Sequence, residues 1–186
     1  MGGPLDPPNA PGPTDGVRAP GTPISTLPFV ISQPGYYYVT RALTGGAGEA
    51  GITVSTSNVT IDLGGFTLGG GASSPGAGIA VGAFRNVTIR NGALRAWAYG
   101  IDALGCGNCR VDNVQASSNI NVGIKIGQQT VVSDCNASLN LGIGIVADHA
   151  TVRNCTMSEN VGGGISIGNN SLFEGNRVNE IGRAHV

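Results

Sequence analysis

Two pairs of residues carry side chains that acid–base chemistry could use. Asp148 and His149 are adjacent, while Asp102 and Lys125 each follow a Gly-Ile pair in separate repeats of the chain. An eliminating enzyme needs a base and a cationic group around one uronate carboxyl, and a glycosidase needs clustered carboxyl groups. One acid beside one base on a wet surface more often forms a weak ion pair. We therefore assign no catalytic residue and keep these four side chains as candidates for contact with a glycan.

The aromatic candidates for glycan contact are Trp97 and Tyr99, which lie two residues apart in the segment RAWAYG. Their rings could form a platform for a sugar, or they could pack onto the side of the fold, as large aromatic side chains commonly do. The aspartates are too scattered to supply the six or more oxygens of a calcium cage. The sequence therefore predicts no metal site and no cofactor.

The four cysteines form two different pairs. Cys106 and Cys109 enclose two residues in CGNC, a tight loop that a disulfide could close in an oxidising compartment. A zinc site would need four ligands, and no second Cys/His pair is in reach. Cys135 and Cys155 occupy equivalent positions of neighbouring repeats. We expect them to stack in the interior as free thiols, because adjacent parallel strands offer poor geometry for a bridge.

The elements that must position these residues are short strands that recur along the chain. A Gly-Ile pair opens a unit at Gly51-Ile52, Gly78-Ile79, Gly100-Ile101, Gly123-Ile124, Gly144-Ile145 and Gly164-Ile165. Apolar residues alternate after each isoleucine, which predicts a strand with one buried face. Second strands are centred on Ile61, Ile89, Val111, Val132, Val152 and Leu172, and a third column holds Gly92, Val114, Cys135, Cys155 and Gly175.

Such a repeat, without convincing helices or hairpin turns, predicts coils that stack in parallel about 4.8 Å apart. The predicted fold class is all-β: a single-stranded parallel β-helix (β-solenoid) of about six coils. Asparagine supports this register, because it tolerates left-handed backbone and can hydrogen-bond the neighbouring coil. One turn position holds Asn91, Asn113 and Asn154, with Asp134 and Glu174 in two coils, and another holds Asn119, Asn140 and Asn160.

Composition divides the chain into three parts. Residues 1–24 hold seven prolines and predict an extended arm, residues 25–50 an N-terminal cap with the first strand, and residues 51–186 the coils. The sequence after Leu172 offers no lid for the last coil. Uncovered strand edges recruit other chains, so one expectation is that protomers associate end to end or through the arm, giving an oligomer or a filament. The alternative is that further coils, beyond the sequence given, complete the rod.

The opening segment resembles secreted bacterial right-handed parallel β-helix repeat proteins of the pectate-lyase-like superfamily. The resemblance is carried by QPGYYYV at Gln33–Val39, NVTIDLGGF at Asn58–Phe66 and the later RNVTIRNGALRAWAYGID, and it extends from Pro23 to Gly182. It implies a right-handed coil and a secreted or cell-surface protein whose signal peptide has been removed. That superfamily hosts lyases, hydrolases, epimerases, tailspikes and structural domains. The sequence motifs that hold the catalytic residues in enzymes of that superfamily are absent from this chain, so the resemblance assigns no catalytic residue.

Composition also limits the partners. Charged residues are 11% of the chain and the net charge is −1, so no electrostatic footprint for nucleic acid or an anionic membrane is present. No apolar run approaches the ~20 residues needed for membrane insertion. The coils are short and lack the long loops that build a substrate groove. This favours a non-catalytic extracellular scaffold for structure, assembly or surface attachment, with glycan contact. The alternative is a minimal lyase or hydrolase acting on acidic polysaccharide.

Overall fold

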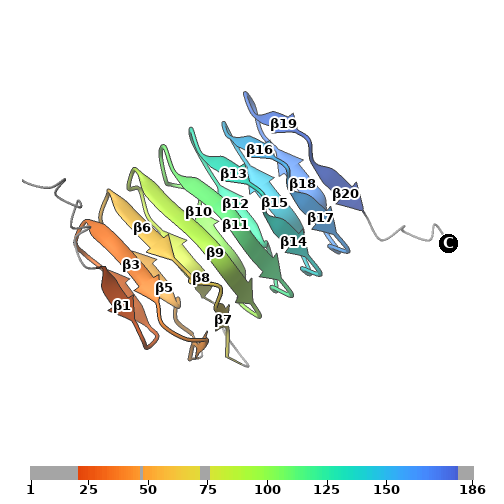
Figure 1. The fold of residues 1–186 in the computed structure, drawn as a ribbon. Coiled ribbons are helices and arrows are strands. Elements are labelled where there is room, and N and C mark those ends of the chain that lie inside the picture. The colour runs from red at the N-terminus through yellow and green to blue at the C-terminus, as the bar shows by residue number, and fades with distance from the viewer. Residues whose placement is uncertain (1–20, 47, 72–75, 180–186) are drawn as a thin grey trace, which may run out of the picture.

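The strands of the protein stack into one rod, in which each turn of the chain lies on the turn before it (Figure 1). The computed structural model describes residues 21–46, 48–71 and 76–179. All strand pairs between the described residues are parallel, and partners lie one coil apart in the sequence. This confirms the predicted all-β parallel β-helix. The described residues contain no helix long and apolar enough to cross a membrane.

Two sheets form the walls of the rod. Sheet B contains seven strands: β2 (Phe29–Ile31), β5 (Ile52–Val54), β8 (Ala77–Val81), β10 (Tyr99–Ala103), β12 (Ile124–Ile126), β15 (Ile143–Ala147) and β18 (Gly163–Ile167). Sheet A bends into two rows of strands. Its first row contains β1 (Thr22–Ile24), β3 (Gly35–Val39), β6 (Val59–Asp62), β9 (Val87–Arg95), β11 (Arg110–Ser117), β13 (Val131–Ser133), β16 (Thr151–Arg153) and β19 (Leu172–Glu174). Its second row contains β4 (Leu43–Thr44), β7 (Thr67–Gly69), the ends of β9 and β11, β14 (Asn136–Ser138), β17 (Thr156–Ser158) and β20 (Arg177–Asn179).

The isoleucine column was predicted correctly. Ile79, Ile101, Ile124, Ile145 and Ile165 are paired in register along sheet B. The first four are fully buried, and Ile165 is partly buried against the core. Because side chains alternate across a strand, one face of each Gly-Ile strand fills the interior while the other faces out.

The last coil departs from the predicted columns by one residue. Val152 pairs with Phe173, whereas Leu172 pairs with Thr151 and is 56% exposed. The turn between β18 and β19 spans residues 168–171, one residue more than the turn 148–150 of the preceding coil. The extra residue in this turn shifts the register of β19 and β20 by one residue relative to the preceding coil.

The same shift corrects two further expectations in the last coil. The left-handed turn position belongs to Gly175, at φ 63°, and not to Glu174, which pairs with Arg153. Beneath Cys155, the third column continues with Asn176 and not with Gly175, because the Cys155 amide donates to Asn176 Oδ1 at 2.7 Å.

The seventh strand of sheet B comes from the segment predicted as an N-terminal cap. Residues 25–50 contain β2, β3 and β4, which pair in register with β5, β6 and β7 and so complete a coil of their own. This coil opens with Pro28-Phe29 in place of Gly-Ile, which hid it from the repeat count. Of the predicted arm, residues 22–24 form β1, and residues 1–20 lie outside the described part of the chain.

Each coil turns through residues with left-handed backbone. One turn position holds Asn91, Asn113, Asp134 and Asn154, all with φ between 51° and 59°. The predicted asparagine row at this position is therefore confirmed up to Asn154. Asparagine and aspartate adopt this conformation at little cost because their short polar side chains can bond locally.

The second asparagine row lies inside the rod. Asn119 and Asn140 are fully buried, and Asn160 is 4% exposed. Asn140 Oδ1 accepts from the backbone and side-chain nitrogens of Asn119 at 3.0 and 2.9 Å, and Asn160 Oδ1 accepts from Asn140 in the same way at 3.0 and 2.8 Å. The row is thus a continuous hydrogen-bonded ladder that satisfies turn amides that no strand reaches.

Candidate functional site

Trp97 is part of the core and is wrong as a glycan-contact residue. Its side chain is fully buried, and its Nε1 donates to the carbonyl of Leu68 at 3.0 Å. The indole fills the space above Gly45, Gly51 and Gly78, where an added Cβ would collide with the ring. The residue follows Ala96, whose backbone is left-handed at φ 60°. A buried ring cannot stack on a sugar.

Tyr99, Asp102 and Lys125 lie together on the outer face of sheet B. Asp102 and Lys125 are direct partners of adjacent strands, as the repeat predicted. The Lys125 amino group lies 5.4 Å from the centroid of the Tyr99 ring, within reach of a cation–π interaction. The expected ion pair between Asp102 and Lys125 does not form; the ion pairs among the described residues are Arg90–Asp62, Arg110–Asp112 and His149–Asp148.

Asp148 and His149 form a separate exposed pair in the turn after β15. His149 Nδ1 lies 3.0 Å from Asp148 Oδ1, and the two side chains are 44% and 49% exposed. His149 holds a left-handed turn position at φ 52°. Hydrogen bonds and ion pairs between described residues do not join this turn to Lys125. The two pairs found in the sequence therefore do not converge on one site.

The aspartates of sheet A are held by neighbouring coils. Asp62 is 8% exposed and accepts from Arg90 Nε at 2.9 Å, from the Gly64 amide at 3.0 Å and from Asn91 at 3.3 Å. Burial alone would raise the pKa of Asp62, but the Gly64 amide, Asn91 and Arg90 together hold that pKa below its usual value. Asp62 is thus a structural acceptor whose charged form is favoured by its partners.

Asp112, in the same outward row, is held in a similar way. Its Oδ1 accepts from Ser133 Oγ at 2.5 Å and from Arg110 Nη2 at 3.1 Å. The Ser133 hydroxyl and the Arg110 guanidinium lower the pKa of Asp112. A general acid would need the opposite shift. The strand register places Asp62, Arg90, Asp112, Ser133 and Arg153 in one row along which acidic and basic residues largely alternate.

A polar groove that the sequence did not reveal lies on the second row of sheet A. It encloses about 280 Å³ and is lined by Gly65, Thr67, Asn91, Gly92, Ala93, Asn113 and Gln115. The outward row runs Thr67, Ala93, Gln115, and the small side chain of Ala93 leaves the floor low between its neighbours. No lining side chain is charged. The turn residues Asn91 and Asn113 were the only signal in the sequence.

Uncharged hydrogen-bonding groups continue from this groove along the rod. Gln115 is followed in register by Asn136 and Thr156, and Ser117 by Ser138 and Ser158. The alternate residues Ala116, Ala137 and Met157 are buried, so the polar side chains face out. The face therefore offers rows of amides and hydroxyls one coil apart.

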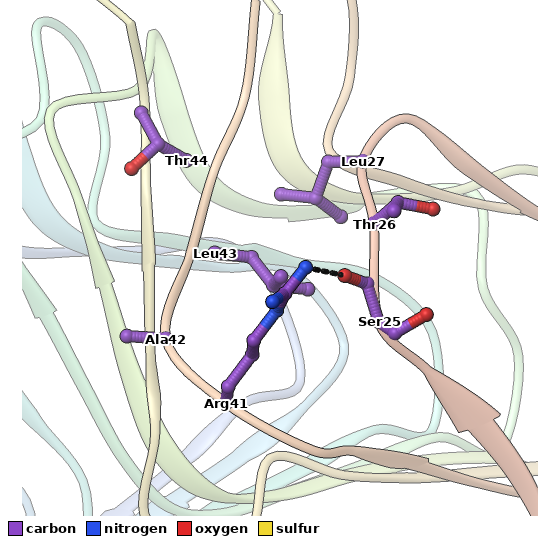
Figure 2. A pocket seen from close by; sticks show the side chains of 7 residues that line it. All are labelled: Ser25, Thr26, Leu27, Arg41, Ala42, Leu43 and Thr44. Carbon is purple, nitrogen blue, oxygen red and sulfur yellow. Dashed lines mark hydrogen bonds between the residues drawn. The ribbon is translucent and has the colours of Figure 1, made fainter.

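A second hollow lies near the N-terminal end of the rod (Figure 2). It encloses about 350 Å³ and is lined by Ser25, Thr26, Leu27, Arg41, Ala42, Leu43 and Thr44. Arg41 Nη2 donates to the backbone carbonyl of Ser25 at 3.0 Å, which ties the segment after β1 to the segment before β4. The arginine thus has a structural contact that accounts for its position.

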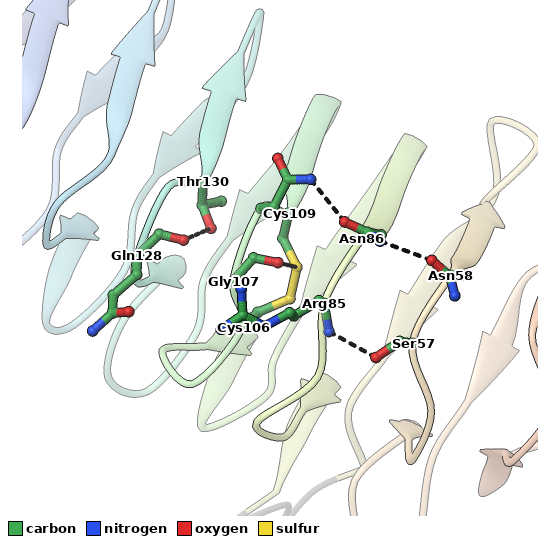
Figure 3. The surroundings of a disulfide bond; sticks show 10 residues. Ser57, Asn58, Arg85, Asn86, Cys106, Gly107, Cys109, Gln128 and Thr130 are labelled. Atoms are coloured by element: carbon green, nitrogen blue, oxygen red, sulfur yellow. Dashed lines mark hydrogen bonds between the residues drawn. A yellow bond between two sulfur atoms is a disulfide. The ribbon is translucent and has the colours of Figure 1, made fainter.

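Cys106 and Cys109 form the predicted disulfide (Figure 3), with their Cα atoms 6.1 Å apart. The bridged loop lies beside a ladder in which Asn86 Nδ2 donates to Asn58 and Asn108 Nδ2 donates to Asn86, at 2.8 and 2.7 Å. Cys135 and Cys155 are buried free thiols, as expected. The adjacent Cys155 sulfur, together with burial, raises the pKa of the Cys135 thiol far above its usual value.

Alkylation distinguishes the two pairs of cysteines. In denaturant without reductant, we expect two of the four cysteines to be labelled, Cys135 and Cys155, because only these carry thiols. Adding reductant before the label should expose Cys106 and Cys109 as well. Peptide mass spectrometry reads out both states. Labelling of Cys106 without reductant, or a blocked Cys155, would contradict the assignment.

The geometry defines a β-solenoid repeat protein whose charged groups stabilise its coils. The model of a family described as right handed beta helix region matches residues 46–185, and the chain belongs to this family. Searches of curated proteins and of solved structures gave no match. The coil is therefore right-handed, as the sequence resemblance implied.

Proposed function

We propose that the protein is a non-catalytic β-helix scaffold that attaches to uncharged polysaccharide through the polar groove. The observation that carries the proposal is the uncharged lining of the groove, with amides and hydroxyls from three neighbouring coils. Ligand sites combine a hollow with a few convergent polar groups. Phe66, which lies in the sequence between the lining residues Gly65 and Thr67, is 37% exposed.

The charged residues support a scaffold over a lyase or hydrolase. Asp62 and Asp112 are occupied by cross-coil hydrogen bonds, and both have lowered pKa values. Lys125 lies on sheet B, over Tyr99, on a different face from the groove. The Cys106–Cys109 disulfide supports a secreted or cell-surface location, since disulfides persist in oxidising compartments.

End-to-end assembly is part of the same proposal. The last described coil exposes Phe173 and Val178, each 37% exposed, and Ile167, 43% exposed. Among the described residues, β18, β19 and β20 each have a strand partner on one side only, and strand edges of this kind pair with further strands.

Affinity electrophoresis tests the attachment. Native gels are cast with soluble glucan, mannan or xylan, and with pectate and alginate as acidic comparisons. We expect at least one neutral glycan to retard the protein, and Gln115→Ala with Thr67→Ala to weaken that retardation about tenfold. Thr60→Ala, on the first row of sheet A, is the matched control and should bind as the parent does.

The same glycans test the absence of catalysis. After incubation they should show no new reducing ends and no unsaturated ends. Retardation by none of the neutral glycans would refute the attachment, and unsaturated ends released from pectate would refute the scaffold.

A further inference from the structure

The outer face of sheet B carries one acid and one base, Asp102 and Lys125, side by side on neighbouring strands. The exposed Val30 of β2 begins its outward row. The six strands from β5 to β18 continue that row with Thr53, Ala80, Asp102, Lys125, Val146 and Ser166. The first five are half-buried and Ser166 is exposed, while their strand neighbours such as Ile101, Ile124 and Ile145 fill the core. Four of these six side chains are polar and two are aliphatic, so the row combines an acid, a base, two hydroxyl groups and apolar surface.

The order of the six residues from β5 to β18 is complementary to itself when reversed, while Val30 of β2 has no counterpart. The centre of the row lies between the acid Asp102 and the base Lys125. Moving outward from the centre, Ala80 corresponds to Val146, and Thr53 corresponds to Ser166. Acid thus matches base, aliphatic matches aliphatic and hydroxyl matches hydroxyl. The six matched residues lie between Thr53 and Ser166, so the match includes neither terminus of the chain.

The two central charges are available to a partner. Asp102 and Lys125 are direct strand partners, yet they form no ion pair with each other. The Lys125 ammonium lies instead over the Tyr99 ring, near the middle of the face. Opposite charges placed across an interface fix its register and disfavour other arrangements.

We propose that two copies of the protein pack their sheet B faces together with the rods antiparallel. The two-fold axis runs parallel to the strands and passes between β10 and β12. Asp102 of each copy then faces Lys125 of the other, Ala80 faces Val146, and Tyr99 faces Val122. A parallel arrangement of the rods would instead place Asp102 against Asp102 and Lys125 against Lys125.

The size of the face sets the strength to expect. Six strands overlap, from β5 to β18, at about 4.8 Å per strand and about 3.3 Å per residue along each strand, which gives roughly 500 Å² on each copy. The total of roughly 1,000 Å² lies at the low end of specific interfaces. The dimer should therefore form at high protein concentration and dissociate on dilution.

Charge exchange tests the pairing. Sedimentation equilibrium should show the parent protein passing from monomer to dimer as its concentration rises. Asp102→Lys and Lys125→Asp should each weaken self-association at least about tenfold, since like charges then meet twice in every dimer. An equimolar mixture of the two variants should form a heterodimer, because every charge again faces its opposite. The variant carrying both changes should regain the parent's association.

Controls separate this surface from others. Glu174→Lys, exposed on sheet A, makes the same change in net charge as Asp102→Lys and should leave the dimer intact. Val146→Arg should weaken the dimer without altering either central charge. Far-ultraviolet circular dichroism confirms that each variant keeps its strands.

Several outcomes would overturn the proposal. A parent protein that stays monomeric at its solubility limit would do so. Single charge variants that associate like the parent would place any association elsewhere, such as the ends of the rod. A mixture of the two variants that remains monomeric would exclude the antiparallel register.

Discussion

Replacing Asn140 with alanine is expected to lower the free energy of unfolding by about 3–5 kcal/mol. Asn140 occupies the centre of the buried ladder, where its Oδ1 accepts from two nitrogens of Asn119 and its Nδ2 donates to Ala116 O at 3.1 Å and Asn160 Oδ1 at 2.8 Å. Alanine leaves these groups buried without partners, and a buried polar group without a partner costs more than its hydrogen bond contributed. Urea unfolding followed by circular dichroism measures the loss.

Asn136→Ala is the matched control for this substitution. Asn136 lies on the same coil and is exposed on the outer face of β14. Its removal should change the free energy of unfolding by no more than about 0.5 kcal/mol. Equal effects of the two substitutions would mean that the ladder does not stabilise the coils.

Trp97→Ala is expected to destabilise the protein by about 3–5 kcal/mol, through the cavity left in the core. The indole is fully buried, contacts three glycines from earlier coils and donates to Leu68 O. These glycines carry no side chain that could move into the space. Trp97→Phe keeps much of the volume but loses the hydrogen bond, so it should fall between the parent and the alanine variant.

The parent protein gives an independent readout, because Trp97 is its single tryptophan. Its fluorescence should be blue-shifted in the folded state and should move to the red on unfolding. Unfolding of the variants is followed by circular dichroism. A native emission maximum typical of solvated indole, or a neutral Trp97→Ala variant, would show that the ring is not enclosed.

The fold could be predicted from the sequence wherever the same type of residue recurred at the same position of the repeat. The column from Ile79 to Ile145 could be predicted because each isoleucine follows a glycine at the start of a strand. The last coil could not, because one extra turn residue between Gly168 and Ser171 leaves the pattern of residue types unchanged while moving Phe173 into the place expected for Leu172. The first coil was hidden because Phe29 replaces the usual isoleucine.

The candidate site was less accessible to sequence reasoning. Asp102 and Lys125 were placed correctly because strand register follows from the repeat. Trp97 was not, because the alternation of side chains along a strand does not extend into a turn, so a turn residue can point outward or inward. The polar groove depends on Ala93 being smaller than its outward neighbours Thr67 and Gln115. A difference in size between residues distant in the sequence gives no local signal.

The stacking of coils also determines how the chain can change length without losing its fold. Ile124 and Ile145 are partners on adjacent strands, so Gly123 could be joined directly to Ile145 with residues 124–144 removed. Strand pairing joins each coil only to the turns beside it, so such a deletion would remove one unit and leave the pairing of the others unchanged. Duplication of the same stretch would add one unit. Evolution can therefore lengthen or shorten this rod in whole steps, each step adding or removing one rung of the asparagine ladder.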